Sequence, residues 1–311
     1  MPISNTAPFL LRLYQYQKER FPIAGHGLLI GVFSFSAIAY SRLCRGLPDF
    51  VSPERYWVCL FNTFTLFFLL RVSDEHKDRE DDARFRAYLP VPRGLVSLRE
   101  LRAVAYVLMA AQLLANVFLY PEILPLYAAV MLFLGLMAKE FFVRDWLKQR
   151  LFWYVASHML IIPLVDVFAS GFDWLLNGAA APVGLVFFFF TSYCNGLVLE
   201  IGRKIKPPDH EEPGVQSYTH VLGHAEGCWP LAAVLSITAV LALLSASYAG
   251  HGRWEFLTLF FLLISCSVPA LLFLQKFSLQ RAKWIEYASA LWTLGMYLIL
   301  GGVPMLIKVL G

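Results

Sequence analysis

The segment FNTFTLFFLLRVSDEHKDREDD, residues 61–82, passes directly from an apolar run into a cluster of acidic residues. Six carboxylates lie in the nine residues from Asp74 to Asp82. An apolar run favours a helix inside a membrane, whereas acids at its end favour water or a bound cation. The segment therefore predicts a membrane helix that ends in the aqueous phase. Its acids belong either to a solvated loop or to a site that holds a cation.

The composition of the whole chain supports the membrane assignment. Of its 311 residues, 58% are hydrophobic and 15% are charged, whereas charged residues make up about a quarter of an average soluble domain. We expect an all-α fold, a polytopic membrane protein with about nine transmembrane helices bundled around a central cavity, in a single domain over residues 1–311. The expected spans are about 21–43, 55–72, 101–119, 122–142, 151–172, 181–201, 229–249, 254–275 and 286–307.

Lysine and arginine are distributed unevenly over the two sides that nine spans define. The side of the N-terminus has 21 of the 26 Lys and Arg residues, and the other side has five. Because positively charged loops stay in the cytoplasm, we expect the first side to be cytoplasmic and to carry the active site. In a bacterium the membrane would be the inner one. No Lys/Arg-rich block with interleaved aromatics is present, so nucleic acid is not an expected partner.

The first acidic segment has a helical spacing. If the second span continues past the bilayer, Asp74, Asp78 and Asp82 lie at i, i+4 and i+8 on one face, while Glu75 and Asp81 point elsewhere. Carboxylates this close repel one another unless a cation neutralises them. Hard oxygen ligands favour Mg²⁺, which completes its shell with waters and phosphate oxygens. The alternative is a solvated helix end, with the acids paired to neighbouring basic residues.

A loop punctuated by Pro and Gly follows, with Arg93 directly before Gly94. A guanidinium group recognises phosphate oxygens in a bidentate way, so we expect Arg93 to close over a phosphate.

A second acidic segment follows the sixth span, in YCNGLVLEIGRKIKPPDHEEPGVQSYTHVLG. Glu200 lies at the membrane edge, where an ionisable residue is costly and is a functional candidate. Arg203 and Lys204 are one turn later and can pair with Glu200 while still reaching a phosphate. The alternative is a snorkelling helix end followed by a hydrophilic turn. The other polar candidates of this segment are Asn195, Asp209, Glu211 and Glu212.

Together these features resemble the UbiA superfamily of intramembrane prenyltransferases, as a divergent branch. The first family motif reads NxxxDxxxD and is followed by a basic, Pro-containing segment that ends in Gly and Ser or Thr. Here Asp74, Asp78 and Asp82 supply the acids and PVPRGLVS supplies the segment. The tail of the second motif matches GVQSYTHVLG, residues 214–223. The chain departs from the family in two places: Asp74 replaces the Asn, and the second DxxxD is absent.

The resemblance implies Mg²⁺-dependent ionisation of an isoprenyl diphosphate and attack of a lipophilic or aromatic acceptor on the allylic cation. Asp74, Asp78 and Glu200 would be the catalytic acids. Mg²⁺ would be held by Asp74, Asp78, Asp82, Glu200 and one of Asp209 or Glu211. Residues that neutralise the leaving group would be Lys77, Arg93, Lys139, Arg144, Arg203 and Lys204.

Two further residues lie one helical turn apart on the fifth span. Tyr154 and His158 are candidates for substrate binding, and His158 is a candidate for removing a proton from an acceptor. A packing histidine with a hydrogen bond is the alternative.

Three functions remain open from the sequence. The first is transfer of a prenyl group to a lipophilic or aromatic acceptor, and the second is a related terpene cyclase that quenches the cation internally. The third is a transporter or lipid-binding membrane protein with vestigial acidic loops that have no catalytic role. The chain has no pair of spans broken by Gly and Pro in corresponding halves, the feature expected of an inverted-repeat transporter.

Overall fold

The computed structural model describes residues 6–211 and 217–310. Within these residues there are helices and no β-strand, and nine helical segments are long and apolar enough to cross a membrane. The all-α membrane fold and the expected number of spans are therefore confirmed. The segments are Ile23–Cys44 (α2), Pro53–Lys77 (α3), Leu98–Leu119 (α5), Pro121–Ala138 (with α6, Leu124–Ala138), Leu151–Asn177 (with α8, Leu151–Met159, and α9, Ile161–Gly171), Gly184–Arg203 (α10), Glu226–Tyr248 (with α12, Trp229–Tyr248), Arg253–Gln275 (α13) and Leu279–Leu310 (with α14, Leu279–Tyr297, and α15, Val303–Leu310).

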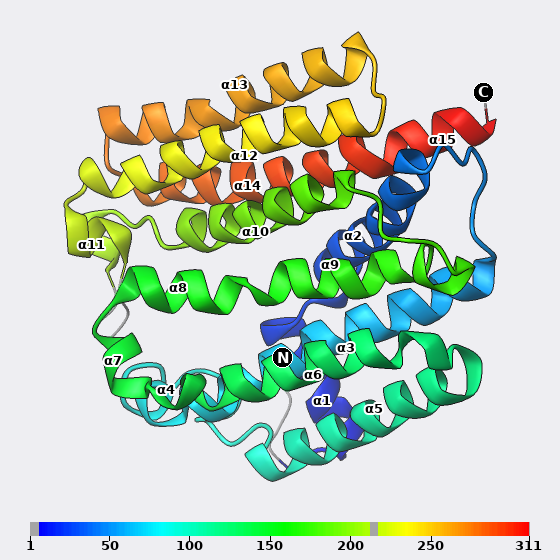
Figure 1. The fold of residues 1–311 in the computed structure, drawn as a ribbon. Helices are drawn as coiled ribbons and strands as arrows, with labels where there is room; N and C mark the ends of the chain where they lie inside the picture. Colours follow the sequence, from blue (N-terminus) through cyan, green and yellow to red (C-terminus); the bar gives the residue numbers. More distant parts are fainter. Residues whose placement is uncertain (1–5, 212–216, 311) are drawn as a thin grey trace.

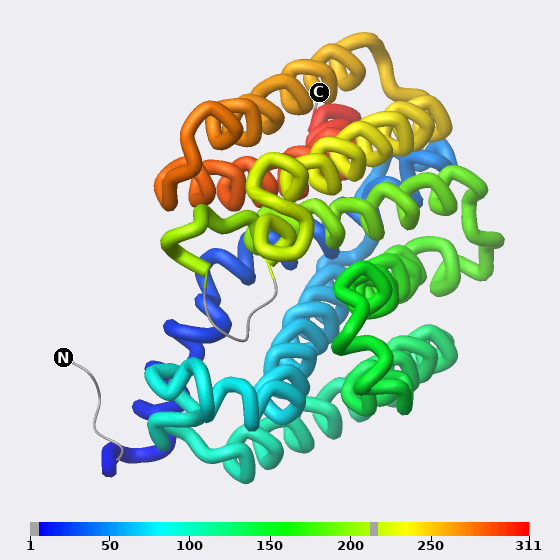
Figure 2. Tube along the Cα trace, turned by 90° about the vertical axis from the view of Figure 1, so that its left-hand side faces the viewer, coloured from blue at the N-terminus to red at the C-terminus, as the bar shows by residue number. Residues whose placement is uncertain are grey.

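The long helices lie side by side in two groups (Figure 1). One group contains α10, α12, α13 and α14, which pack against one another, and the other contains α3, α5, α6 and α9. Helix α2 lies between the groups, because it contacts both α3 and α9 on one side and α10 and α14 on the other. Figure 2 views the bundle from one end, with the yellow-to-red helices above the cyan-to-green ones.

The ninth span changes its winding where it meets α2. A π-helical turn, η6 (Leu298–Gly302), joins α14 to α15 and packs on α2. A Cβ atom on Gly301 would lie 2.3 Å from the carbonyl oxygen of Ser36, so only glycine permits this backbone contact.

The short helices between the spans gather at one end of the bundle. Figure 1 shows α4 (Arg79–Phe85), α7 (Arg144–Lys148) and α11 (Tyr218–Leu222) at the same end, beside the start of α8. The helices α3 and α10 both end there, at Lys77 and Arg203. Both acidic segments therefore lie at one end of the bundle, as the sequence predicts for connections on one side of the membrane.

The opposite end of the bundle is closed by a buried ion-pair cluster. The carboxylate of Asp173, which is fully buried, accepts hydrogen bonds from Arg42 at 3.0 Å, from Arg45 at 2.9 Å and from Ser41 at 2.7 Å. This arrangement joins the end of α2 to the end of the fifth span. The cluster therefore gives Asp173 a structural role at this end of the bundle.

The Asp173→Asn substitution is expected to lower the free energy of unfolding by about 3 kcal/mol, because it leaves two arginines without their buried counter-charge. The measurement is denaturation of the purified protein in detergent, followed by circular dichroism. Asp49→Asn is the matched control, since Asp49 pairs with the same Arg42 at 2.5 Å but its side chain is 71% exposed. That exposed pair should contribute less than about 1 kcal/mol. Equal losses for the two variants would contradict the assignment.

Candidate functional site

A cavity of about 950 Å³ opens at the end of the bundle where α3 and α10 terminate. Side chains from both acidic segments line it. Its deeper wall is apolar and includes Phe67, Leu70 and Ile162. The charged residues of the lining are Arg20, Arg71, Asp74, Lys77, Asp78, Asp81, Arg86, Glu140, Lys148, Glu200, Arg203, Lys204, Lys206, Glu211 and Glu286.

Two of the three expected aspartates face this cavity together. Asp74 lies on the last turn of α3 with its side chain 40% exposed, and Asp78 is the residue at which α3 ends. Burial raises the pKa of the Asp78 carboxyl above its ordinary value, and the negative charge of Asp74 raises it further. A cation placed between the two carboxylates would relieve this repulsion. Asp74 is also 3.2 Å from the ammonium group of Lys77.

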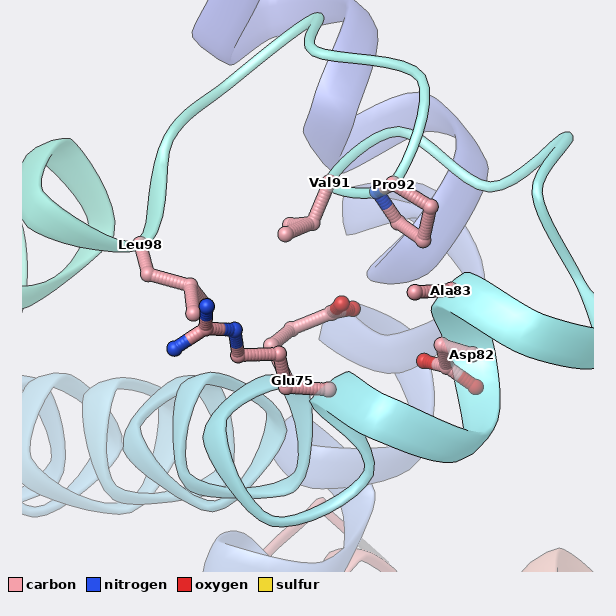
Figure 3. A pocket seen from close by; sticks show the side chains of 7 residues that line it. Glu75, Asp82, Ala83, Val91, Pro92 and Leu98 are labelled. Carbon is pink, nitrogen blue, oxygen red and sulfur yellow. The ribbon is translucent and has the colours of Figure 1, made fainter.

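Asp82 does not share the face of Asp74 and Asp78, which corrects the prediction of one continuous helix. The backbone leaves α3 at Asp78 and starts α4 at Arg79. Asp82 is thereby placed on a smaller cavity of about 140 Å³, where Figure 3 shows its carboxylate near that of Glu75. Arg86 lies 2.6 Å from Asp82, and Asp82 is 2% exposed.

Glu75 and Asp81 also differ in their surroundings. Glu75 points away from the large cavity, as expected, and is paired with Arg20 at 2.8 Å and Arg71 at 3.3 Å. Asp81 was expected to point elsewhere too, but it lines the large cavity and is 3.0 Å from Lys148. The change of direction at Asp78 explains the difference, because it rotates every side chain of α4 relative to α3.

Glu200 lies on the last turn of α10 and contributes the other acidic wall. Its side chain is 7% exposed, and its two oxygens are paired with Arg203 at 2.5 Å and Lys204 at 2.8 Å. The side chain of Arg203 is 58% exposed and also lines the cavity. The expected pairing of Glu200 with both cations is confirmed.

Lys77 connects the first acidic segment to the fifth span. Its ammonium group, on a side chain that is 6% exposed, lies 3.2 Å from Asp74, 3.5 Å from the hydroxyl of Tyr154 and 4.0 Å from Glu140. Tyr154 stacks on His158 with ring centroids 4.1 Å apart, and both line the cavity. These side chains form one continuous polar wall.

Glu140 is a buried residue of this wall that the sequence does not single out. It lies between α6 and α7, where Glu140, Phe141 and Phe142 all have positive φ angles of 50°, 52° and 62°. Non-glycine residues in this region cost backbone strain, which collects at functional sites. Burial raises the pKa of Glu140, although the charge of Lys77 lowers it. The only sequence signal is an acid close to the end of the expected span 122–142.

Several predicted site residues lie outside the lining of the large cavity. The guanidinium group of Arg93, expected to close over a phosphate, instead binds Glu19 at 2.7 Å and the carbonyl of Tyr88 at 2.8 Å. Arg144 donates to the backbone carbonyl of Lys77 at 3.2 Å and does not line the cavity. Three other candidates are Lys139 and Asp209, which are exposed, and Asn195, which is buried within α10.

Glu211 lines the cavity, but its oxygens are engaged by neighbours. It accepts a hydrogen bond from Ser217 at 3.1 Å and lies 2.6 Å from the ring of His220. Glu212 and residues 214–216 of the second motif lie outside the described residues.

The sequence does not anticipate several basic residues of the lining. Arg20 comes from α1 (Phe9–Arg20), a helix before the first span, and Arg71 and Arg86 flank the first acidic segment. Lys206 and His210 complete the group, and the acidic Glu286 of α14 lines the cavity beside them. Only the fold brings them together, because no spacing in the chain relates α1 to the second segment.

Comparisons with known proteins support the fold. No family model matches the chain, and no curated protein matches it. Among solved structures, a digeranylgeranylglyceryl phosphate synthase in membranes is similar over 94% of this chain and 99% of its own, with a TM-score of 0.63 and 17% identity. At this identity the likeness concerns the fold alone.

Proposed function

We propose that this protein transfers a prenyl group from an isoprenyl diphosphate to a lipophilic or aromatic acceptor within the membrane. One observation carries the proposal: a single cavity combines adjacent carboxylates, Asp74 and Asp78, with buried or half-buried cations from α3 and α10, above an apolar floor. This combination suits a molecule with an anionic head and a hydrocarbon tail. The solved neighbour is itself named as a synthase of a geranylgeranyl product.

Mg²⁺ fits the first acidic segment. Asp74 and Asp78 offer two neighbouring carboxylates, and Mg²⁺ usually takes one or two carboxylates and completes its shell with waters and phosphate oxygens. When bound, the ion would neutralise charge on the diphosphate. Asp82 does not belong to this set, because Arg86 holds it on the smaller cavity.

The cations of the cavity would stabilise the leaving group. As the bond between the allylic carbon and the diphosphate oxygen breaks, its electron pair moves to the diphosphate. Lys77, Arg203 and Lys204 lie on the cavity wall before the reaction begins. Charges that are already in place favour a transition state in which negative charge develops.

His158 has the geometry to take the proton that the acceptor loses. Its Nδ1 lies 2.8 Å from the carbonyl oxygen of Tyr154. Since a carbonyl only accepts, Nδ1 carries the hydrogen and Nε2 of the neutral ring keeps a lone pair. The Nε2 atom has no hydrogen-bond partner among the described residues, and Glu140 lies 3.9 Å from it. Glu140 would stabilise the imidazolium that forms.

The proposal is tested by incubating purified protein with Mg²⁺ and labelled allylic diphosphates of ten to twenty carbons and longer. Acceptors would be a hydroxybenzoate and a glyceryl phosphate that carries one geranylgeranyl chain. We expect pyrophosphate release coupled to labelling of one acceptor. Release of pyrophosphate with a hydrocarbon or alcohol from the donor alone would identify a cyclase instead. Absence of pyrophosphate release with every donor would contradict both enzymes and favour a transporter or lipid-binding protein.

A further inference from the structure

We propose that the second acidic segment holds no divalent cation, and that Arg203 and Lys204 bind the diphosphate directly. The site then uses one divalent ion, at Asp74 and Asp78, and two fixed protein cations on the facing wall. This inference rests on the proposed function. It departs from the resemblance, which implies a metal at the second motif as well.

Glu200 is the only acid of α10 on the cavity, and its oxygens are already neutralised. Arg203 approaches Oε2 at 2.5 Å and Lys204 approaches Oε1 at 2.8 Å. The Nε atom of Arg203 also donates to Oε2, at 2.6 Å. A divalent ion at Glu200 would have to displace these donors and remain beside two positive charges. The Coulomb repulsion from these two cations opposes such an ion.

The other acids of this segment that the structure describes, Asp209 and Glu211, do not replace Glu200. Glu211 accepts from Ser217 and contacts His220, and Asp209 lies outside the lining. Over residues 6–211 and 217–310, no three His, Cys, Asp or Glu side chains come together as a metal site. The first segment meets the modest demand of Mg²⁺ with two carboxylates, whereas the two described acids of the second segment that line the cavity, Glu200 and Glu211, are both engaged by neighbouring side chains.

The residue one helical turn after Glu200 is a cation and not a second acid. Glu200 and Lys204 lie four residues apart, which is the spacing of the acids in the DxxxD motif that the chain lacks. On the last turn of α10 both side chains reach the same cavity. Lys204 places a fixed positive charge on the cavity wall, one helical turn from Glu200, where a second carboxylate would be needed to hold a metal ion. The fixed charge can meet the diphosphate without an ion in between.

The two cations retain the capacity to bind phosphate. Arg203 is 58% exposed towards the cavity and uses Nε and Nη2 on Glu200, so its Nη1 donors remain for a ligand. Guanidinium and ammonium groups form short, charge-assisted hydrogen bonds with phosphate oxygens. Among the described residues, the cavity lining holds eight Lys and Arg against seven Asp and Glu. This balance suits an anion with one divalent ion better than an anion with two.

The test counts metal ions without relying on turnover. Purified protein would be titrated with Mn²⁺ in the presence of inorganic pyrophosphate, and bound Mn²⁺ measured by electron paramagnetic resonance. We expect one bound ion per chain in the wild type, one in Glu200→Gln and none in Asp78→Asn. We expect Lys204→Asp, which restores an acid pair with Glu200, to bind two. Lys204→Met should keep one ion and weaken pyrophosphate binding about tenfold.

Two bound ions in the wild type, or the loss of an ion in Glu200→Gln, would overturn the inference while leaving the proposed function in place. The number of Mn²⁺ ions bound per wild-type chain tests the inference even if Lys204→Asp fails to fold. A wild-type protein that binds no pyrophosphate with Mn²⁺ would overturn the proposed function, and this inference with it.

Discussion

The Asp78→Asn substitution is expected to lower the rate of prenyl transfer about 1,000-fold, because it removes one of two carboxylates that would hold the cation facing the diphosphate. Asparagine has nearly the same shape, so α3 should still end at position 78. The loss should appear in the turnover number, measured as the initial rate of acceptor labelling at saturating donor. The stability of the variant in detergent should stay near that of the wild type.

Asp81→Asn is the matched control for this prediction. Asp81 lies three residues away, lines the same cavity and pairs with Lys148 at 3.0 Å, but its side chain is 43% exposed. An exposed pair of this kind contributes little, so we expect a rate within about threefold of the wild type. A similar loss in both variants would show that general negative charge, rather than the pair of Asp74 and Asp78, governs the reaction.

The Lys77→Met substitution is expected to lower the turnover number about 100-fold, since a buried ammonium group at the leaving diphosphate is removed. Methionine retains the unbranched shape but leaves Asp74 and Glu140 without the cation that lies 3.2 Å and 4.0 Å from them. We therefore also expect some loss of stability. The measurement is the turnover number at saturating Mg²⁺ and donor, in protein that circular dichroism shows to be folded.

Lys283→Met, on the exposed face of α14, serves as the control for the loss of one lysine. It should leave both rate and stability unchanged. A folded Lys77→Met variant with the wild-type turnover number would exclude Lys77 from leaving-group stabilisation.

The membrane fold was predictable because it depends on long apolar runs, which local composition reveals. The limits of individual helices were less predictable. The second span was expected to end near residue 72 but continues to Lys77, and the ninth begins at Leu279 rather than near residue 286. Charged residues extend both helices into the aqueous phase, where hydropathy no longer marks the end of a span.

The orientation of side chains at the site was only partly predictable. The spacing of Asp74 and Asp78 is correct on a helix, but the same reasoning fails for Asp82, because the direction of the backbone changes between α3 and α4. The partner of Arg93 is Glu19, 74 residues away, and no local pattern relates the two. The position of Glu140 could not be predicted for another reason. Its left-handed turn contains neither glycine nor asparagine, the residues that usually mark such a turn in a sequence.

The most direct test of the account is a structure with Mn²⁺ and a prenyl thiolodiphosphate that does not ionise. The central claim is that two segments far apart in the chain bind one diphosphate from opposite walls of a cavity. We expect the anomalous signal of Mn²⁺ beside Asp74 and Asp78, and phosphate oxygens within hydrogen-bond distance of Arg203 or Lys204. A diphosphate that contacts only one of these walls, or that binds outside the cavity, would contradict the claim.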